Sequence, residues 1–396
     1  MSNEISHSKK QTCLYCGNNP VNHTVTYITE WVGTKLSPYE SRLTNSWFGR
    51  NGYKLATQLE RFFFRLFTIF GIGRWNTDPK ILTLDRGRVM FEEAQRRGIP
   101  IKSFVIYGKP IDTYKAKIGG KWMVFQGLPR KEKEVQTTWI DDKAVLKKKL
   151  LENNIPAPRG ASVSSLDEAL ALFETLEKPV ITKPRSGSRG RHTTTMVYTA
   201  DQLKDAFTIA QMISPHVVLE EHIFGSVYRG TVIGGELIGV LAGDPPRVTG
   251  DGASTVRELI EKKNAARPQV IHEYKINPLT ETFLKRSGYT LESVIPAGVT
   301  VDLSEKIGTS YGGSSTELFD TAHPKIKEYL KRAGAVVNDN LVGFDFIIPD
   351  PTADPDTQKW GIIECNTLPF INLHHDPVNG TPRNVAKHVW DLWIKE

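Results

Sequence analysis

The sequence has little cysteine: only Cys13, Cys16 and Cys365 occur in 396 residues. Three cysteines cannot build a disulfide framework, so we expect a protein of the reducing cytoplasm. No apolar run reaches membrane-spanning length, and the opening residues lack the apolar core of a signal peptide. Low-complexity tracts are absent too. With 39% hydrophobic and 24% charged residues, the composition is that of a soluble globular protein.

A length of 396 residues exceeds one ordinary core, so we expect two or three domains. We divide the chain into an N-terminal extension (1–77), an α/β region (78–140) and a C-terminal domain (141–396). The formal charge of +7 favours anionic ligands, and nucleotides or polycarboxylates qualify as well as nucleic acid. Because the basic residues are dispersed and no reader motif occurs, no nucleic-acid partner is predicted.

Within the extension, Cys13-Leu-Tyr-Cys16 has the spacing of a zinc knuckle. His23 and His7 are the candidates for further Zn²⁺ ligands. A second cysteine pair is missing, and neither histidine repeats a standard finger spacing. A tethered N-terminal loop is therefore the alternative interpretation.

The segment Leu55–Ile72 predicts a helix with a wide phenylalanine-rich face, interrupted by Arg61 and Arg65. Such a helix can lie on a membrane surface. Packing on its own domain, or on a second subunit of a homo-oligomer, is the favoured interpretation, so no membrane partner is predicted.

The α/β region follows a regular pattern of elements. We predict a helix Asp85–Arg97 ending at Gly98, a strand Lys102–Tyr107, and a hairpin of Tyr114–Ile118 with Lys121–Gln126. A helix Asp142–Asn153 then ends before Ile155–Pro158, a natural domain joint.

The most informative segment is a predicted hairpin of Gly343–Ile348 and Trp360–Asn366. Folding it about the Pro- and Asp-rich turn sets Asp345 opposite Glu364. Strand alternation places Ile362, Glu364 and Asn366 on one face, Ile363 and Cys365 on the other, and Asp345 away from Phe344 and Phe346. Two carboxylates and an amide oxygen on one patch suit Mg²⁺. The alternative is a half-exposed hairpin whose acids face water, as we expect for Asp354 and Asp356 in the turn.

A second segment suggests phosphate binding. Lys183 ends a short strand (Pro179–Pro184), and the small residues of Ser186–Gly190 follow at once. A lysine beside a Gly/Ser-rich loop can hold nucleotide phosphates through its ammonium group and backbone N–H groups. A flexible surface loop is the alternative. The strand Val217–Glu221 ends in two acids, with an ordinary edge strand as its alternative.

Taken in order, these pieces resemble the ATP-grasp superfamily, closest to the ATP-grasp domain of cyanophycin synthetase and of bifunctional glutathione synthetases. The similarity covers about residues 142–396 and includes VITKPRSGSRGR, VVLEEHIFGSVYRG, TSYGGSSTELFD, LVGFDFII and IIECNTLPFINLHHDPVNGTPRNV. It implies an α/β (α+β) ATP-grasp fold, with residues 78–140 as a pre-ATP-grasp-like region.

The resemblance implies roles at matching positions. Lys183 would bind the ATP phosphates together with Ser186, Gly187, Ser188 and Gly190. Lys143, or Lys147 or Lys148 in its place, would be the earlier ATP lysine. The adenine edge would fall to Glu220, Glu221 and Ile223. Ser310, Gly312 and Gly313 would line the acceptor side of the γ-phosphate, and Arg229 would bind the substrate carboxylate. Two Mg²⁺ (or Mn²⁺) ions would be bound by Asp345, Glu364 and Asn366.

Four positions depart from that pattern. Val227 stands where an acid usually contacts the ribose, and Gly243 where a basic residue is common, with Arg247 as a candidate substitute. Asn372 replaces an expected arginine, and Tyr311 a small residue. The last three lie where substrate would bind.

The resemblance implies an ATP-dependent carboxylate–amine ligase, catalysing through Lys183, Arg229 and Ser310 and acting on small-molecule acids and amines such as amino acids or short peptides. An acyl phosphate would form and an amine would attack it. His374, His375 or Asp376 is the candidate base, with a structural role as the alternative. The rival functions are a kinase on the same scaffold and a non-catalytic nucleotide-binding module docked to a membrane or partner.

Overall fold

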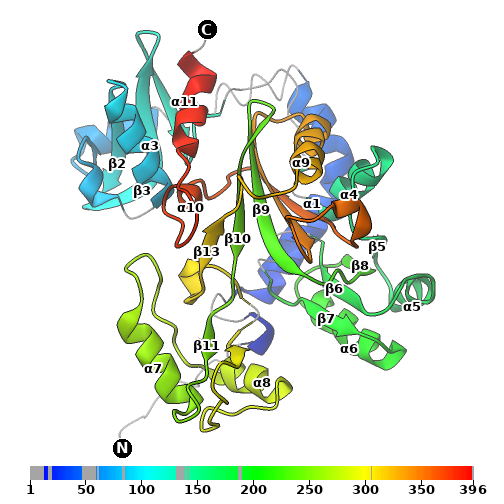
Figure 1. Cartoon of the computed structure of the whole chain (residues 1–396). Helices are drawn as coiled ribbons and strands as arrows, with labels where there is room; N and C mark the ends of the chain where they lie inside the picture. The colour runs from blue at the N-terminus through cyan, green and yellow to red at the C-terminus, as the bar shows by residue number, and fades with distance from the viewer. Residues whose placement is uncertain are drawn as a thin grey trace, which may run out of the picture. The chain divides into compact units, whose positions relative to one another are not determined.

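The computed structural model (Figure 1) describes residues 13–16, 20–46, 59, 62–82, 85–130, 139–140, 142–185, 190–304 and 306–394. The chain divides into two compact units. The first comprises residues 1–38, 142–144 and 158–222, and the second residues 39–141, 145–157 and 223–396. These units are defined by packing, and their boundaries differ from those of our segments 1–77, 78–140 and 141–396. The three segments remain a prediction of the domain organisation.

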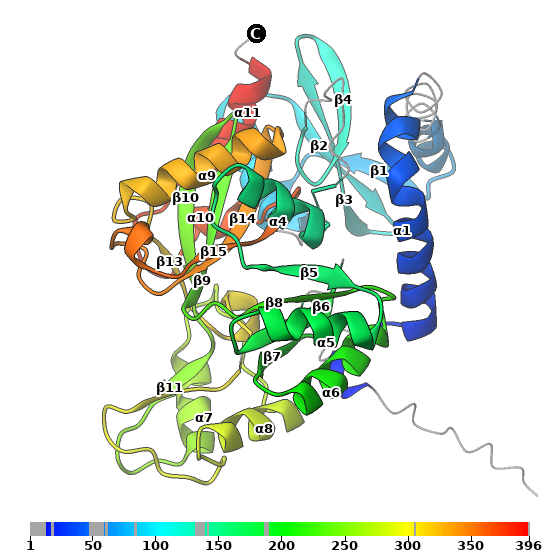
Figure 2. The same ribbon diagram turned by 90° about the vertical axis from the view of Figure 1, so that its right-hand side faces the viewer.

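The first unit is built on a four-stranded antiparallel sheet in the order β5-β8-β6-β7. Its strands are β5 (Gly160–Val163), β6 (Val180–Pro184), β7 (Thr194–Val197) and β8 (Val217–Glu221). Helices α5 (Leu166–Thr175) and α6 (Ala200–Gln211) lie against it (Figure 2) and share its apolar core. Since β8 is central and buried throughout, the edge-strand alternative for Val217–Glu221 is wrong.

The N-terminal segment contributes a short helical turn, η1 (Leu14–Cys16), and the long helix α1 (His23–Asn45). The sequence did not predict α1. Gly33 and Pro38 lie inside it, and both residues disfavour a helix interior.

The second unit is built on a five-stranded antiparallel sheet in the order β13-β10-β9-β14-β15. The strands are β9 (Ser226–Ile233), β10 (Glu236–Gly243), β13 (Ser315–Glu317), β14 (Leu341–Ile348) and β15 (Gly361–Asn366). Helices α9 (Pro324–Val337) and α4 (Lys143–Glu152) contribute apolar side chains to the core on one face of this sheet, including Leu330 and Leu146. The helix predicted over Asp142–Asn153 is confirmed as α4.

A second sheet of this unit has the order β1-β2-β3-β4, all antiparallel. Its strands are β1 (Gly73–Asn76), β2 (Ile101–Ile106), β3 (Lys109–Ile118) and β4 (Lys121–Gln126), and helices α3 (Asp85–Arg96) and α11 (Val385–Ile394) share its core. The predicted helix, strand and hairpin of this region are confirmed. Gly119 and Gly120 have φ of 56° and 80° at the tip of the β3–β4 hairpin, and glycine adopts positive φ at both central positions of such a turn without strain.

A smaller subdomain of the second unit has its own apolar core. It consists of strands β11 (Arg247–Thr249) and β12 (Thr300–Asp302) and helices α7 (Val256–Ala266) and α8 (Pro278–Arg286). Within the predicted helix Leu55–Ile72, residues 62–69 are helical, and residues 55–58, 60 and 61 lie outside the described residues. Phe64 packs on Trp75 and Phe104, as expected for a helix covering its own domain. No helix among the described residues is both long and apolar enough to cross a bilayer.

Candidate functional site

Strands β14 and β15 pair as predicted, with Asp345 directly opposite Glu364 and Gly343 opposite Asn366. The predicted faces of Glu364, Cys365 and Asn366 are confirmed, but those of Ile362 and Ile363 are wrong, because the register shifts between Asp345 and Phe346. This bulge inserts one extra residue, so Ile362 joins Cys365 in the buried core while Ile363, Glu364 and Asn366 are only half-buried. The bulge leaves both carboxylates on the side away from the core.

Asp345 is the centre of this patch. Its carboxylate accepts two hydrogen bonds from Arg229, Nε–Oδ1 at 2.7 Å and Nη2–Oδ2 at 2.8 Å. The Asn366 Nδ2 donates to the same carboxylate at 3.2 Å. Burial lowers the pKa of Arg229, but the charges of Asp345 and Glu364 outweigh it, so the pKa is raised. Arg229 thus supplies the positive charge that two adjacent acids require.

The donors of the patch fit a hard divalent cation. Asp345 and Glu364 offer carboxylate oxygens and Asn366 carries an amide oxygen, which are ligand types that Mg²⁺ prefers. The turn acids differ from this set. Asp354 and Asp356 both accept hydrogen bonds from Lys325, at 2.7 and 2.6 Å, so the expectation that they are merely solvated is wrong.

A cavity of about 980 Å³ opens beside the patch, lined by Arg229, Asp345 and Ser310 among the predicted residues. Arg86 and Arg88 of α3 line it as well. Neither arginine was predicted as a site residue, since both lie more than a hundred residues before the hairpin in the chain. Arg86 is held by Asp112 at 2.5 Å. Arg88 pairs with Glu92 and Asp376.

Two glycines give the loop after residue 307 a tight geometry. Gly312 has φ of 79°, and a Cβ there would lie 2.9 Å from the Cβ of Tyr274. At Gly313 a Cβ would meet the Asp244 carbonyl oxygen at 2.0 Å. Neither position tolerates a side chain, so the loop brings Ser310 of η3 (Thr309–Tyr311) to the cavity wall.

The four departures from the family pattern all line the cavity, Val227 included. A Cβ at Gly243 would approach the Ile307 side chain to 3.2 Å, so a basic residue there requires Ile307 to move. Among the described lining residues Arg247 is missing. It pairs instead with Asp302 across β11 and β12, at 2.9 Å.

The His374-His375-Asp376 cluster divides by role. His374 is fully buried, with Nδ1 2.6 Å from Glu317 and Nε2 2.8 Å from the Thr231 hydroxyl. Burial lowers the pKa of His375 to about 4, and its Nε2 accepts the Ala386 N–H. Both histidines therefore hold the fold, and of the three residues Asp376 alone lines the cavity.

In the first unit, Lys183 and Glu220 form a buried ion pair with Nζ 2.5 Å from Oε1. Glu221 is also buried; its N–H donates to the Arg159 carbonyl, and its carboxylate accepts the Glu177 N–H. Lys143 lies in this unit and is buried. Of the predicted phosphate loop, Ser186, Gly187 and Ser188 lie outside the described residues, and Gly190 is described with φ of 74°.

The remaining candidates for ATP contacts fall in the second unit. Ile223 is buried there, directly after β8 in the sequence. Of the alternative lysines, Lys147 is buried, while Lys148 is exposed and lies 3.9 Å from Glu152.

No protein-family model matches the chain. Over 319 residues, 76% of this chain, it is 27% identical to the cyanophycin synthetase of Nostoc sp., covering 34% of that protein. Over 271 residues, 66% of this chain, it is 30% identical to the glutathione biosynthesis bifunctional protein GshAB of Clostridium perfringens, covering 35% of it. A solved bifunctional glutathione synthetase from Pasteurella multocida matches 78% of this chain and 43% of its own, at 25% identity and a TM-score of 0.58.

The fold is therefore the mixed α/β architecture, with helices and antiparallel sheets, of an ATP-grasp protein. The predicted resemblance to the ATP-grasp superfamily, close to cyanophycin synthetase and bifunctional glutathione synthetase, is confirmed. The chain spans about a third of the length of the curated relatives it matches.

Proposed function

We propose that the protein is an ATP-dependent carboxylate–amine ligase. The observation that carries this proposal is the acid pair Asp345 and Glu364, set in register next to Asn366, with Asp345 and Arg229 on a cavity wall. Relatives named as cyanophycin synthetase and bifunctional glutathione synthetase supply the reaction class.

The acid patch and its arginine define the proposed chemistry. Asp345, Glu364 and Asn366 would hold Mg²⁺, two ions in the family pattern, which neutralise phosphate charge when bound. The carboxylates would bind the ion through their oxygens, and Asn366 would bind it through its amide oxygen. Arg229, which lines the cavity, would pair with the substrate carboxylate.

Nucleotide contacts are assigned to the buried pair of the first unit. Lys183 would direct its ammonium group to the phosphates, and Glu220 would accept from the adenine amino group. Lys143, Glu221, Ile223 and the 186–190 loop complete the proposed ATP contacts. Ser310, Gly312 and Gly313 would line the acceptor side of the γ-phosphate.

The cavity favours an amino acid or short peptide as substrate. Arg86, Arg88 and Arg229 line it, and guanidinium groups pair well with carboxylates. The carboxylate of an amino acid or short peptide would pair with these guanidinium groups.

The experiment that tests the proposal measures phosphate release from ATP with amino acids and short peptides in acid–amine pairs. A ligase releases phosphate only when both partners are present, and the product mass equals acid plus amine minus water. A kinase would instead add a phosphoryl group to a single acceptor. Phosphate release that never depends on a second substrate would refute the ligase assignment.

A further inference from the structure

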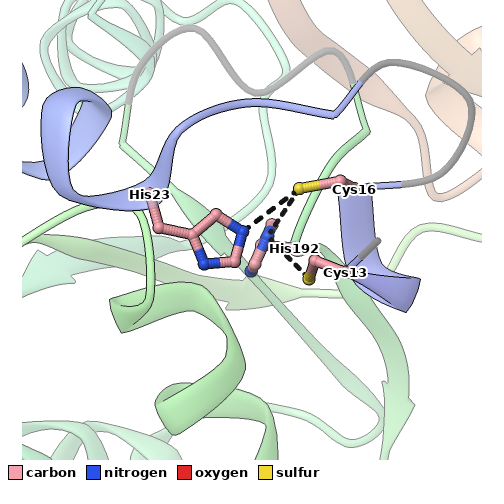
Figure 3. A group of neighbouring side chains, drawn as sticks. All are labelled: Cys13, Cys16, His23 and His192. Atoms are coloured by element: carbon pink, nitrogen blue, oxygen red, sulfur yellow. Dashed lines mark hydrogen bonds between the residues drawn. The ribbon is translucent and has the colours of Figure 1, made fainter. Parts of the chain in front are cut away.

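Four metal-ligating side chains meet in the first unit, away from the acid patch (Figure 3). The sulfur and nitrogen atoms of Cys13, Cys16, His23 and His192 all lie within 4.8 Å of one another. Cys13 precedes η1, Cys16 ends it, His23 begins α1, and His192 follows Gly190 by two residues. The sequence offered His23 as a ligand but not His192, which is distant in the chain. The other candidate, His7, lies outside the described residues.

The distances match a tetrahedral site. Zinc with Zn–S near 2.3 Å and Zn–N near 2.0 Å sets neighbouring ligand atoms about 3.6 Å apart. Cys16 Sγ is 3.2 Å from His23 Nε2 and 3.4 Å from His192 Nε2, and Cys13 Sγ is 3.7 Å from His192 Nε2. The three spacings bracket that value.

His192 is held in the state that a metal ligand needs. Its Nδ1 lies 2.7 Å from the Ile209 carbonyl oxygen, to which it donates. The lone pair of the neutral ring is therefore on Nε2, which faces the two cysteines. A hydrogen bond from the second ring nitrogen to a backbone carbonyl is typical of zinc-bound histidine.

The contacts around the cluster also favour a preformed metal site. The backbone N–H of His192 donates to the Tyr15 carbonyl oxygen at an N–O distance of 3.0 Å. The His23 and His192 rings meet edge to face, with their centroids 4.8 Å apart. Cys16 and His192 are each only 1% exposed. Two cysteines and two histidines packed this closely offer the sulfur and nitrogen ligands that a tetrahedral zinc site uses.

We propose that Cys13, Cys16, His23 and His192 bind one structural Zn²⁺ ion. With four protein ligands the site is closed, so the ion serves folding and not catalysis. It ties the N-terminal segment to the chain just after the predicted phosphate loop. This site is independent of the ligase proposal, and its test needs no turnover.

The full-length protein, purified without chelators, is analysed for zinc by mass spectrometry. The expected content is one ion per chain, falling to near none in Cys16→Ser and His192→Gln. His216→Gln, a histidine of the same unit outside the cluster, is the matched control and keeps its zinc. Zinc retained by both ligand variants would overturn the proposal.

A second measurement uses the wild-type chain alone, so it stands even if the variants fail to fold. Metal is stripped from the protein and Co²⁺ is added. The intense visible absorption of tetrahedral cobalt with thiolate ligands is expected, together with protection of Cys13 and Cys16 from a thiol reagent. Absence of that spectrum, or a Cys13–Cys16 disulfide in the native protein, would refute the site.

Discussion

Replacing Arg229 by glutamine removes the guanidinium that neutralises Asp345. Arg229 and Asp345 are joined by two charge-assisted hydrogen bonds, and their side chains are 20% and 16% exposed. Breaking a fully buried pair costs about 3–5 kcal/mol, and a single hydrogen bond to a charged group contributes about 1.5–3 kcal/mol. Because this pair keeps some solvent, we expect a loss of about 3 kcal/mol, which includes the repulsion between Asp345 and Glu364.

The assay is thermal unfolding without metal and again with MgATP. A loss of about 3 kcal/mol lowers the melting temperature of a unit this large by roughly 6 °C. Because Mg²⁺ replaces the missing positive charge, MgATP should narrow the gap between Arg229→Gln and the wild type. Arg247→Gln is the matched control, since its exposed pair with Asp302 is worth at most about 1 kcal/mol. An Arg229→Gln protein that melts like the wild type would refute the reasoning.

Two further predictions concern buried titratable groups. Burial lowers the pKa of His375 from 6.5 to about 4. Its neutral form therefore stabilises the fold fully above pH 6.5, and up to about 1.4 kcal/mol per pH unit is lost as the pH falls to 4. His375→Gln should flatten that part of the stability–pH curve, and an unchanged slope would contradict it. Lys183→Gln leaves Glu220 buried without its cation, and we expect calorimetry to show weaker ATP binding. The control is Lys204→Gln, which changes an exposed lysine of the same unit and should leave ATP affinity unchanged. Equal ATP affinities in the two variants would count against the role assigned to Lys183.

The hairpin was predictable because its information is local. A Pro- and Asp-rich turn and strand alternation suffice to set Asp345 opposite Glu364. The bulge between Asp345 and Phe346 was not predictable, since no residue there demands one. It reversed the predicted faces of Ile362 and Ile363 without disturbing the acid pair.

Contacts between residues far apart in the chain could not be predicted from the sequence, for a different reason. Arg86 lines the cavity beside Asp345, and His192 meets Cys13 and Cys16. Tertiary packing brings such residues together, and neither motif spacing nor hydrophobic periodicity predicts tertiary packing. A spacing rule that finds Cys13 and Cys16 therefore yields two ligands of a possible four, and supplies no means of choosing His192 over the other histidines.

The central claim is that the Asp345–Glu364 patch supports ATP-dependent joining of an acid to an amine. Its most direct test is phosphate release by Glu364→Gln beside the wild type, with Glu236→Gln, an exposed partner of Lys331 in the same unit, as control. We predict that Glu364→Gln loses release that depends on both substrates, while its melting temperature stays near that of the wild type. Turnover by Glu364→Gln equal to that of the wild type and of Glu236→Gln would contradict the claim.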